Sequence, residues 1–202
     1  MSGFLPQLKE YIESGDVKSA EAILPIVDIE EDSYEYVTFI IELRALVASY
    51  YKEKKQLELL AIIQLIATSE KLPFTENWPQ YIDLISNAIG GIVVLDKKYD
   101  REELLKQVLN KLPKKNPYVA NHEGINYNLA CFYAINGQKE EMIEYIRRAR
   151  FYFEADKFLQ DHSFDQYKKE AFFKKLLNST GDAAWIWWTQ AWPIMEWYDE
   201  SN

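Results

Sequence analysis

Large and small side chains alternate along residues 126–149, NYNLACFYAINGQKEEMIEYIRRA. Ala130, Cys131 and Ala134 are compact, and large side chains at such positions would hold two helix axes farther apart than the usual ~8 to 10 Å. Gly137 then offers the left-handed backbone that ends a helix and reverses the chain, and apolar residues resume at helical spacing. The stretch therefore predicts two antiparallel helices joined by a tight turn, a hairpin that stacks on copies of itself.

Further helices are predicted along the rest of the chain. Glycine and proline number only seven each in 202 residues, while Leu, Ile, Ala, Glu and Lys dominate the long stretches, which favours helices over strands. Apolar residues recur at helical spacing, and Ser, Asp, Gly and Pro mark the ends, with Gly15 at a turn and with Asp16 and Asp100 as N-caps. These signals predict helices at residues 4–13, 17–27, 33–54, 56–71, 79–95, 100–113 and from residue 116 onward.

The residue 126–149 stretch resembles the tetratricopeptide repeat (TPR) family. It has that family's Tyr-Asn-Leu-small order in the first helix, a tyrosine one turn on, glycine at the turn and alanine late in the second helix. It departs from the family at Asn126, Met142 and Glu154, where the family has tryptophan, a small residue and proline. The resemblance implies a fold and leaves the activity open, because this family hosts binding modules of many kinds.

Other parts of the chain resemble the family less closely. Residues 1–27 match a weaker copy, residues 46–65 match loosely with a lysine at the turn, and residues 158–177 are similar to the segment that ends such arrays. The resemblance implies an all-α fold, a right-handed α-α superhelix or TPR-like solenoid. It has about four helical hairpins in residues 1–154, with capping helices and a tryptophan-rich segment in residues 155–202, all in one domain.

The charge of the chain argues against nucleic acid as a partner. The net charge is −9 and the pI is near 4.9, whereas binding to phosphates depends on a dense Lys/Arg surface. Residues 1–90 carry fifteen acids and seven bases, a net charge of −8. We therefore expect an electrostatic binding face for a basic protein in the first half of the chain.

An acidic run is the candidate for that binding face. Five carboxylates make it up: Asp28, Glu30, Glu31, Asp32 and Glu35. A general acid needs a buried carboxyl group with a raised pKa, and this run is typical of a solvated loop. Its functional interpretation is a landing site for a basic partner, and plain solubility is the alternative. Tyrosines are further candidates for core and binding groove alike: Tyr11, Tyr50, Tyr51, Tyr127 and Tyr133.

Tryptophan is concentrated near the C-terminus, where five of the six lie in AWIWWTQAWPIMEWY, residues 184–198. Aromatic side chains bury large areas and are enriched at binding hot spots, so Trp188, Trp192 and Trp197 are candidate partner contacts. The structural interpretation is a cap that seals the open end of a helical array. Homodimerisation through this segment is the third possibility.

No catalytic or metal-binding pattern emerges from the sequence. His122 and His162 are forty residues apart and lack the spacing of a zinc motif such as H-E-x-x-H. Cys131 lies in the small-residue stripe, where cysteine acts as a compact apolar filler. Gly90-Gly91 lies inside a helical pattern and indicates a kink or a close helix crossing rather than a phosphate loop. The chain is therefore predicted to be non-enzymatic, without metal or cofactor.

The sequence also predicts a cytoplasmic protein. The start, MSGFLPQLKEY, lacks the basic and apolar regions of a secretory signal, and no apolar run approaches the ~18 to 20 residues that span a bilayer. One cysteine cannot form an internal disulfide, which fits a reducing compartment.

These features together predict a non-enzymatic protein-binding module. The most specific hypothesis is a bacterial immunity-type protein that binds and neutralises a basic toxin domain, because an acidic chain is suited to fast electrostatic capture of such a partner. The alternative is a TPR-like adaptor or regulatory protein that binds a peptide or a helical partner. An enzyme with an unfamiliar site is the third hypothesis.

Charge reversal at Glu30, Glu31 and Asp32 to lysine is expected to slow association with a basic partner and to leave the fold intact. The reason is that long-range attraction raises association rates, up to ~10⁸ to 10⁹ M⁻¹ s⁻¹ at low salt. Stopped-flow kinetics over a range of salt concentrations would measure the change, with circular dichroism as the control for folding. Unchanged kinetics at every salt concentration would remove the electrostatic contribution.

Overall fold

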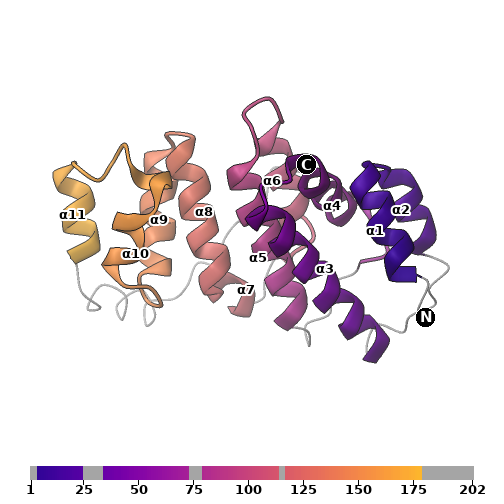
Figure 1. Ribbon diagram of the computed structural model, residues 1–202. Helices are drawn as coiled ribbons and strands as arrows, with labels where there is room; N and C mark the ends of the chain where they lie inside the picture. Colours follow the sequence, from indigo (N-terminus) through magenta and orange to yellow (C-terminus); the bar gives the residue numbers. More distant parts are fainter. Residues whose placement is uncertain (1–3, 25–33, 73–78, 114–116, 179–202) are drawn as a thin grey trace, which may run out of the picture. The chain divides into compact units, whose positions relative to one another are not determined.

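The computed structural model describes residues 4–24, 34–72, 79–113 and 117–178, and all regular structure in these ranges is helical (Figure 1). The all-α prediction is confirmed for them. The chain divides into two compact units, residues 1–112 (unit 1) and residues 113–202 (unit 2). A single domain over residues 1–202 and a continuous superhelix both stay predictions.

Unit 1 contains six helices in its described part. They are α1 (Phe4–Ser14), α2 (Val17–Ile23), α3 (Tyr34–Lys52), α4 (Gln56–Thr68), α5 (Pro79–Val94) and α6 (Arg101–Leu109). The predicted caps are confirmed at two of them, because a carboxylate Oδ1 accepts the backbone N–H three residues on. Asp16 accepts from Ser19 at 3.0 Å, and Asp100 accepts from Glu103 at 3.0 Å.

Helix α4 is the centre of unit 1, since it packs against α1, α2, α3, α5 and α6. Most of its residues are apolar, and six of the thirteen are buried: Leu59, Ala61, Ile62, Ile63, Leu65 and Ile66. The close helix crossing predicted at Gly90-Gly91 is confirmed for Gly91 on α5. A Cβ there would lie 3.0 Å from Cδ1 of Leu59 and 3.2 Å from Cδ1 of Ile63.

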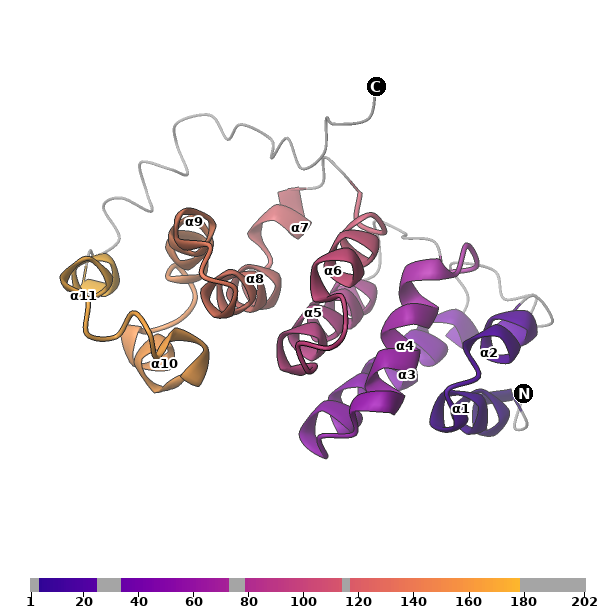
Figure 2. The ribbon, with the colours of Figure 1, turned by 90° about the horizontal axis from the view of Figure 1, so that it is seen from above.

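Helix α3 has its most extensive packing with α5, and the two lie side by side (Figure 2). The pair α1 and α2 packs against α4. The inward side of α3 is buried at six positions: Tyr36, Phe39, Ile40, Leu43, Val47 and Tyr50. Its outward side is exposed to solvent at several positions.

Unit 2 contains five α-helices and one 3₁₀ helix in its described part. They are α7 (Pro117–Asn121), α8 (Glu123–Ile135), α9 (Lys139–Ala149), α10 (Ala155–Gln160), η2 (His162–Phe164) and α11 (Ala171–Asn178). Helices α8 and α9 form the predicted hairpin and make the largest helix contact in the unit. Ala130, Cys131 and Ala134 are all buried within it, as predicted.

The helix predicted from residue 116 onward is wrong as a single element. His122 has an extended backbone (φ −66°, ψ 118°) and separates α7 from α8. Its Nδ1 accepts the backbone N–H of Ile125 at 3.3 Å, so the side chain caps α8. The helices predicted at 56–71 and 100–113 also end early, at Thr68 and Leu109.

Three of the helix pairs close with the same turn. A residue with a left-handed backbone follows the first helix: Gly15 (φ +74°), Lys54 (φ +58°) and Gly137 (φ +76°). The N–H of the next residue donates to a tyrosine carbonyl five residues back: Asp16 to Tyr11 at 2.8 Å, Lys55 to Tyr50 at 2.9 Å and Gln138 to Tyr133 at 2.9 Å. This is the Schellman closure of a helix C-terminus, and it recurs at α1–α2, α3–α4 and α8–α9.

Replacement of Lys54 by glycine is expected to raise the free energy of unfolding by about 0.5 to 1 kcal/mol. A residue with a side chain loses roughly 1 to 2 kcal/mol in the left-handed conformation, and glycine avoids this cost. Part of the gain is cancelled because glycine has more conformational freedom in the unfolded chain. Gly15→Ala and Gly137→Ala are the matched opposites, expected to lose about 1 kcal/mol each. A Cβ at either glycine meets nothing within 4 Å, so backbone strain alone sets that cost. Urea unfolding followed by circular dichroism measures all three, and a destabilised Lys54→Gly variant would contradict the account.

Candidate functional site

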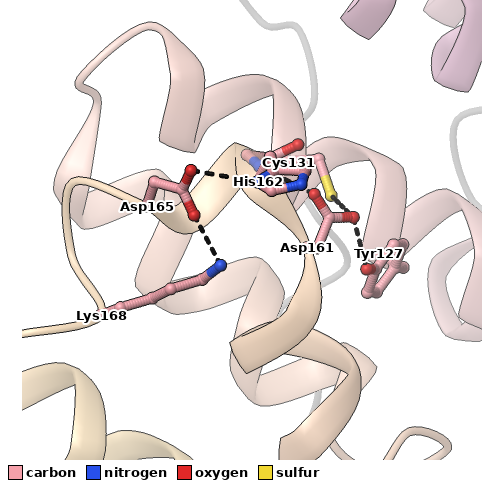
Figure 3. A network of polar contacts seen from close by, with 7 residues as sticks. Tyr127, Cys131, Asp161, His162, Asp165 and Lys168 are labelled. Carbon is pink, nitrogen blue, oxygen red and sulfur yellow. Dashed lines mark hydrogen bonds and ion pairs between the residues drawn. The ribbon is translucent and has the colours of Figure 1, made fainter.

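A polar network in unit 2 ties α8 to the segment after α10 (Figure 3). The Tyr127 hydroxyl donates to Oδ2 of Asp161 at 2.7 Å, and Sγ of Cys131 lies 3.7 Å from the same oxygen. The backbone N–H of Ser163 donates to Oδ1 of Asp161 at 2.8 Å. One carboxylate therefore joins two side chains one turn apart on α8 to the start of η2.

The protonation states in this network follow from burial and hydrogen bonding. Burial, the largest influence, raises the pKa of Asp161, but hydrogen bonds from Tyr127 and Ser163 outweigh it and hold that pKa below its ordinary value. Burial raises the pKa of the Cys131 thiol, and the neighbouring Asp161 charge raises it further. Burial and the hydrogen bond to Asp161 also raise the pKa of Tyr127. The network therefore pairs a charged carboxylate with a protonated thiol and a protonated phenol.

That arrangement suits structural support rather than nucleophilic chemistry. A reactive cysteine needs a thiolate in an exposed, electropositive setting, whereas Cys131 is 3% exposed and contacts a carboxylate. The Tyr127 ring also has aromatic neighbours, with centroids at 5.1 Å from Phe153 and 5.3 Å from Phe158. The prediction that Cys131 is a packing residue is confirmed, and the half-buried Tyr127 packs against the aromatic residues of unit 2.

The two histidines serve separate local roles. His122 is buried and caps α8, as described above. The His162 side chain is 94% exposed, with Nδ1 at 3.2 Å from Oδ2 of Asp165, and Lys168 Nζ lies 2.6 Å from the other oxygen of that carboxylate (Figure 3). Hydrogen bonds from Lys168 and His162 lower the pKa of Asp165. Within the described ranges, no group of three or more His, Cys, Asp or Glu side chains is arranged to hold a metal ion.

The outward side of α3 is an exposed surface in unit 1. We call it the α3 face and define it by six residues that line it at helical spacing: Tyr34, Thr38, Ile41, Ala45, Ala48 and Lys52. Tyr34 is 83% exposed and Ile41 is 40% exposed. Five of these residues are exposed and Thr38 is half-buried. Exposed large apolar side chains on one helix side mark an interaction surface better than isolated ones do.

Charged groups lie at the edges of this face. An ion pair between Arg44 and Asp83 joins α3 to α5, with both side chains partly exposed. Lys52, Lys54 and Lys55 are exposed at the C-terminal end of α3. Lys55 pairs with Glu53 at 3.0 Å. The acidic run precedes α3 in the sequence.

Of the residues predicted to contact a partner, the structure describes the side chains of two, Tyr50 and Tyr51. Tyr51 is 47% exposed at the end of α3, whereas Tyr50 is 2% exposed and its hydroxyl donates to Oε1 of Glu13 at 3.2 Å. Burial and then the Glu13 charge raise the pKa of Tyr50. The backbone of Glu35 belongs to α3, and its side chain lies outside the description. The rest also lie outside the described residues: Asp28, Glu30, Glu31, Asp32, Trp188, Trp192 and Trp197.

The other candidate tyrosines have local partners. The Tyr11 hydroxyl accepts from Nε2 of Gln7 at 3.1 Å. The Tyr133 ring stacks on that of Tyr145, with centroids 5.4 Å apart.

Tyr34 and Ile41 were not among the residues predicted from the sequence to contact a partner. A helix with apolar residues on two sides could have revealed them, since only one of the two sides is needed to pack against the core.

Comparison of the chain with protein-family models, with curated proteins and with solved structures found no match. The resemblance to the TPR family therefore stays an expectation. Among the described helices, none has the length and apolar character needed to cross a bilayer. The exposed surfaces of the two units are thus the basis for a functional proposal.

Replacement of Asp161 by alanine is expected to lower the free energy of unfolding by about 2 to 4 kcal/mol, because it leaves the Tyr127 hydroxyl and the Ser163 N–H without their acceptor. The Asp161→Asn variant keeps an acceptor and is expected to lose less. Asp165→Ala, which removes an exposed ion pair, is the matched control and is expected to cost under about 1 kcal/mol.

The same carboxylate makes the stability depend on pH. The pKa of Asp161 is lower in the folded state than in the unfolded state, so its contribution is complete above the unfolded value of about 4 and is lost as the pH falls through the folded value. Urea unfolding of the wild type and of Asp161→Asn between about pH 7 and pH 2 tests this. Equal acid sensitivity of the two proteins would contradict it.

Proposed function

We propose that this chain is a non-enzymatic protein-binding module, most specifically a bacterial immunity-type protein that binds and neutralises a toxin domain in the cytoplasm. The observation that supports it best is the α3 face, with Tyr34 at 83% exposure and Ile41 at 40%. A partner that covers such side chains stabilises the complex by roughly 25 cal/mol for each Å² of apolar surface removed from water.

The charge of unit 1 adds specificity to this apolar surface. Residues 1–112 carry nineteen acids and twelve bases, a net charge of −7, and four of the acids are Asp28, Glu30, Glu31 and Asp32 directly before α3. A basic toxin domain would be attracted over a distance by the net negative charge of unit 1 and held by apolar contact along α3. Tyr34, at the N-terminal end of the α3 face, suits that role, since aromatic residues are over-represented among binding hot spots.

Neutralisation in this scheme is occlusion. The bound chain covers the active surface of the toxin, so the chain itself needs no catalytic group. The Cys131–Asp161–Tyr127 network fits this scheme as support for unit 2. A TPR-like adaptor would use the same surface but would bind a partner that is not toxic.

A search of the genes beside that of this chain for a toxin gene is the first test, and co-expression with the toxin domain found there is expected to restore growth of a bacterial host that the toxin alone kills. Tyr34→Ala is expected to weaken binding of that domain about tenfold or more, as loss of a hot-spot aromatic does. Phe151→Ala is the matched control, because Phe151 is 55% exposed in unit 2 and lies off the α3 face.

Growth assays and titration calorimetry with the purified toxin domain measure these effects. Lack of rescue and of binding would remove the immunity proposal, and binding of a non-toxic neighbour would favour the adaptor. Equal losses for Tyr34→Ala and Phe151→Ala would remove the α3 face from the proposal.

A further inference from the structure

Two aromatic rings of unit 2 converge on one ammonium group. Nζ of Lys157 lies 3.7 Å from the ring centroid of Phe153 and 4.5 Å from that of Tyr127. The two rings are arranged edge to face, with centroids 5.1 Å apart and an interplanar angle of 65°. The negative face of an aromatic ring attracts a cation that lies within about 6 Å of its centroid. Both rings therefore attract the same cation, and we call them the Tyr127–Phe153 pair.

The pair and its cation come from three parts of unit 2. Tyr127 belongs to α8, Phe153 follows the end of α9, and Lys157 belongs to α10. Tyr127 and Phe153 are half-buried, whereas Lys157 is exposed. Each ring thus keeps part of its surface in contact with solvent, and a cation from solution can reach it.

The Tyr127 ring is held in place by groups other than Lys157. Its hydroxyl donates to Oδ2 of Asp161 at 2.7 Å (Figure 3), and its ring packs against those of Phe158 and Phe164, with centroids at 5.3 Å and 6.5 Å. A hydroxyl that donates to a charged carboxylate is polarised by it, which makes the ring face more attractive to a cation. The pair is therefore preformed, and removal of the Lys157 side chain is expected to leave its geometry intact.

The Lys157 ammonium lies on the rings rather than on a carboxylate. Glu154 and Asp156 are exposed neighbours in the sequence, yet Lys157 forms no ion pair within the described ranges. Lys139 is a useful contrast, because its Nζ lies 3.9 Å from the ring of Phe172 alone. Several aromatic faces around one cation are the arrangement by which proteins recognise quaternary ammonium and methyl-lysine groups.

We infer that the Tyr127–Phe153 pair is a binding site for an alkylammonium group and that Lys157 occupies this site in the absence of a ligand. A ligand displaces Lys157, whose exposed side chain then turns into solvent. A small quaternary ammonium compound and a lysine side chain on a partner share this chemistry. The inference goes beyond the proposed function, which rests on the α3 face of unit 1, so the failure of one leaves the other standing.

Lys157→Ala in the full chain vacates the site and removes an exposed side chain only. Titration with tetramethylammonium chloride, followed by NMR of the Tyr127 and Phe153 ring signals, is expected to give a dissociation constant on the order of 10 mM. The wild type and Lys157→Arg are expected to bind at least tenfold more weakly, because their own cation competes for the rings. Sodium chloride at the same ionic strength is the control for screening. Equal affinity of Lys157→Ala and the wild type would overturn the inference.

Lys139→Ala is the matched control, because it uncovers the single ring of Phe172. It is expected to bind tetramethylammonium at least tenfold more weakly than Lys157→Ala does. Phe153→Leu combined with Lys157→Ala keeps an apolar side chain but removes one ring, and it is expected to lose binding to the same extent. Circular dichroism checks that each variant is folded. If Lys139→Ala and Lys157→Ala bound equally well, any uncovered ring would suffice and the site would be ruled out.

A second ligand distinguishes the two sources of the ammonium group. Nα-acetyl-lysine amide carries the ammonium of a lysine side chain, which is more strongly hydrated than a quaternary ammonium and is costlier to bring onto a ring. Binding of both ligands to Lys157→Ala would favour a lysine on a partner, and binding of tetramethylammonium alone would favour a small quaternary ammonium compound. Binding of neither would overturn the inference.

Discussion

The turn that closes a helix pair is the constraint on which the rest of the structure depends. At Gly15, Lys54 and Gly137 the backbone turns left-handed, and the next N–H donates to a tyrosine carbonyl on the first helix. This satisfies carbonyl groups that a helix end would otherwise leave unpaired and directs the second helix back along the first. At these three turns the second helix thereby packs on the first within a few residues.

The central position of α4 then determines what unit 1 exposes. Because α1, α2, α3, α5 and α6 all pack on α4, most of the apolar surface of α4 is covered. Gly91 allows α5 to approach α4 closely, because a Cβ added at this position would lie only 3.0 Å from Leu59. Helix α3 receives cover on its inward side alone, so Tyr34 and Ile41 remain in water.

In unit 2, groups that resemble a reactive set act as supports. Cys131, Tyr127 and Asp161 lie within hydrogen-bonding reach, yet burial raises the pKa of the thiol and of the phenol. The carboxylate stays charged because it accepts hydrogen bonds from both sides. Such a network stabilises the junction between α8 and η2, and it removes the thiol from the chemistry that an exposed cysteine performs.

The sequence by itself determined the helices, the caps at Asp16 and Asp100 and the turn glycines, because these depend on hydrogen bonds and spacings within about five residues. It also indicated that Cys131 is a packing residue, from its place in the small-residue stripe. The break at His122 is local too, since its side chain caps α8 only three residues on, and it was missed in the sequence. Only the tertiary structure decided that Asp161 binds Tyr127 across 34 residues and that Ile41 faces solvent while Ile40 is buried. Helix α3 is apolar on more than one side, so its own periodicity leaves the buried side undetermined, and long-range packing against α4 and α5 selects it.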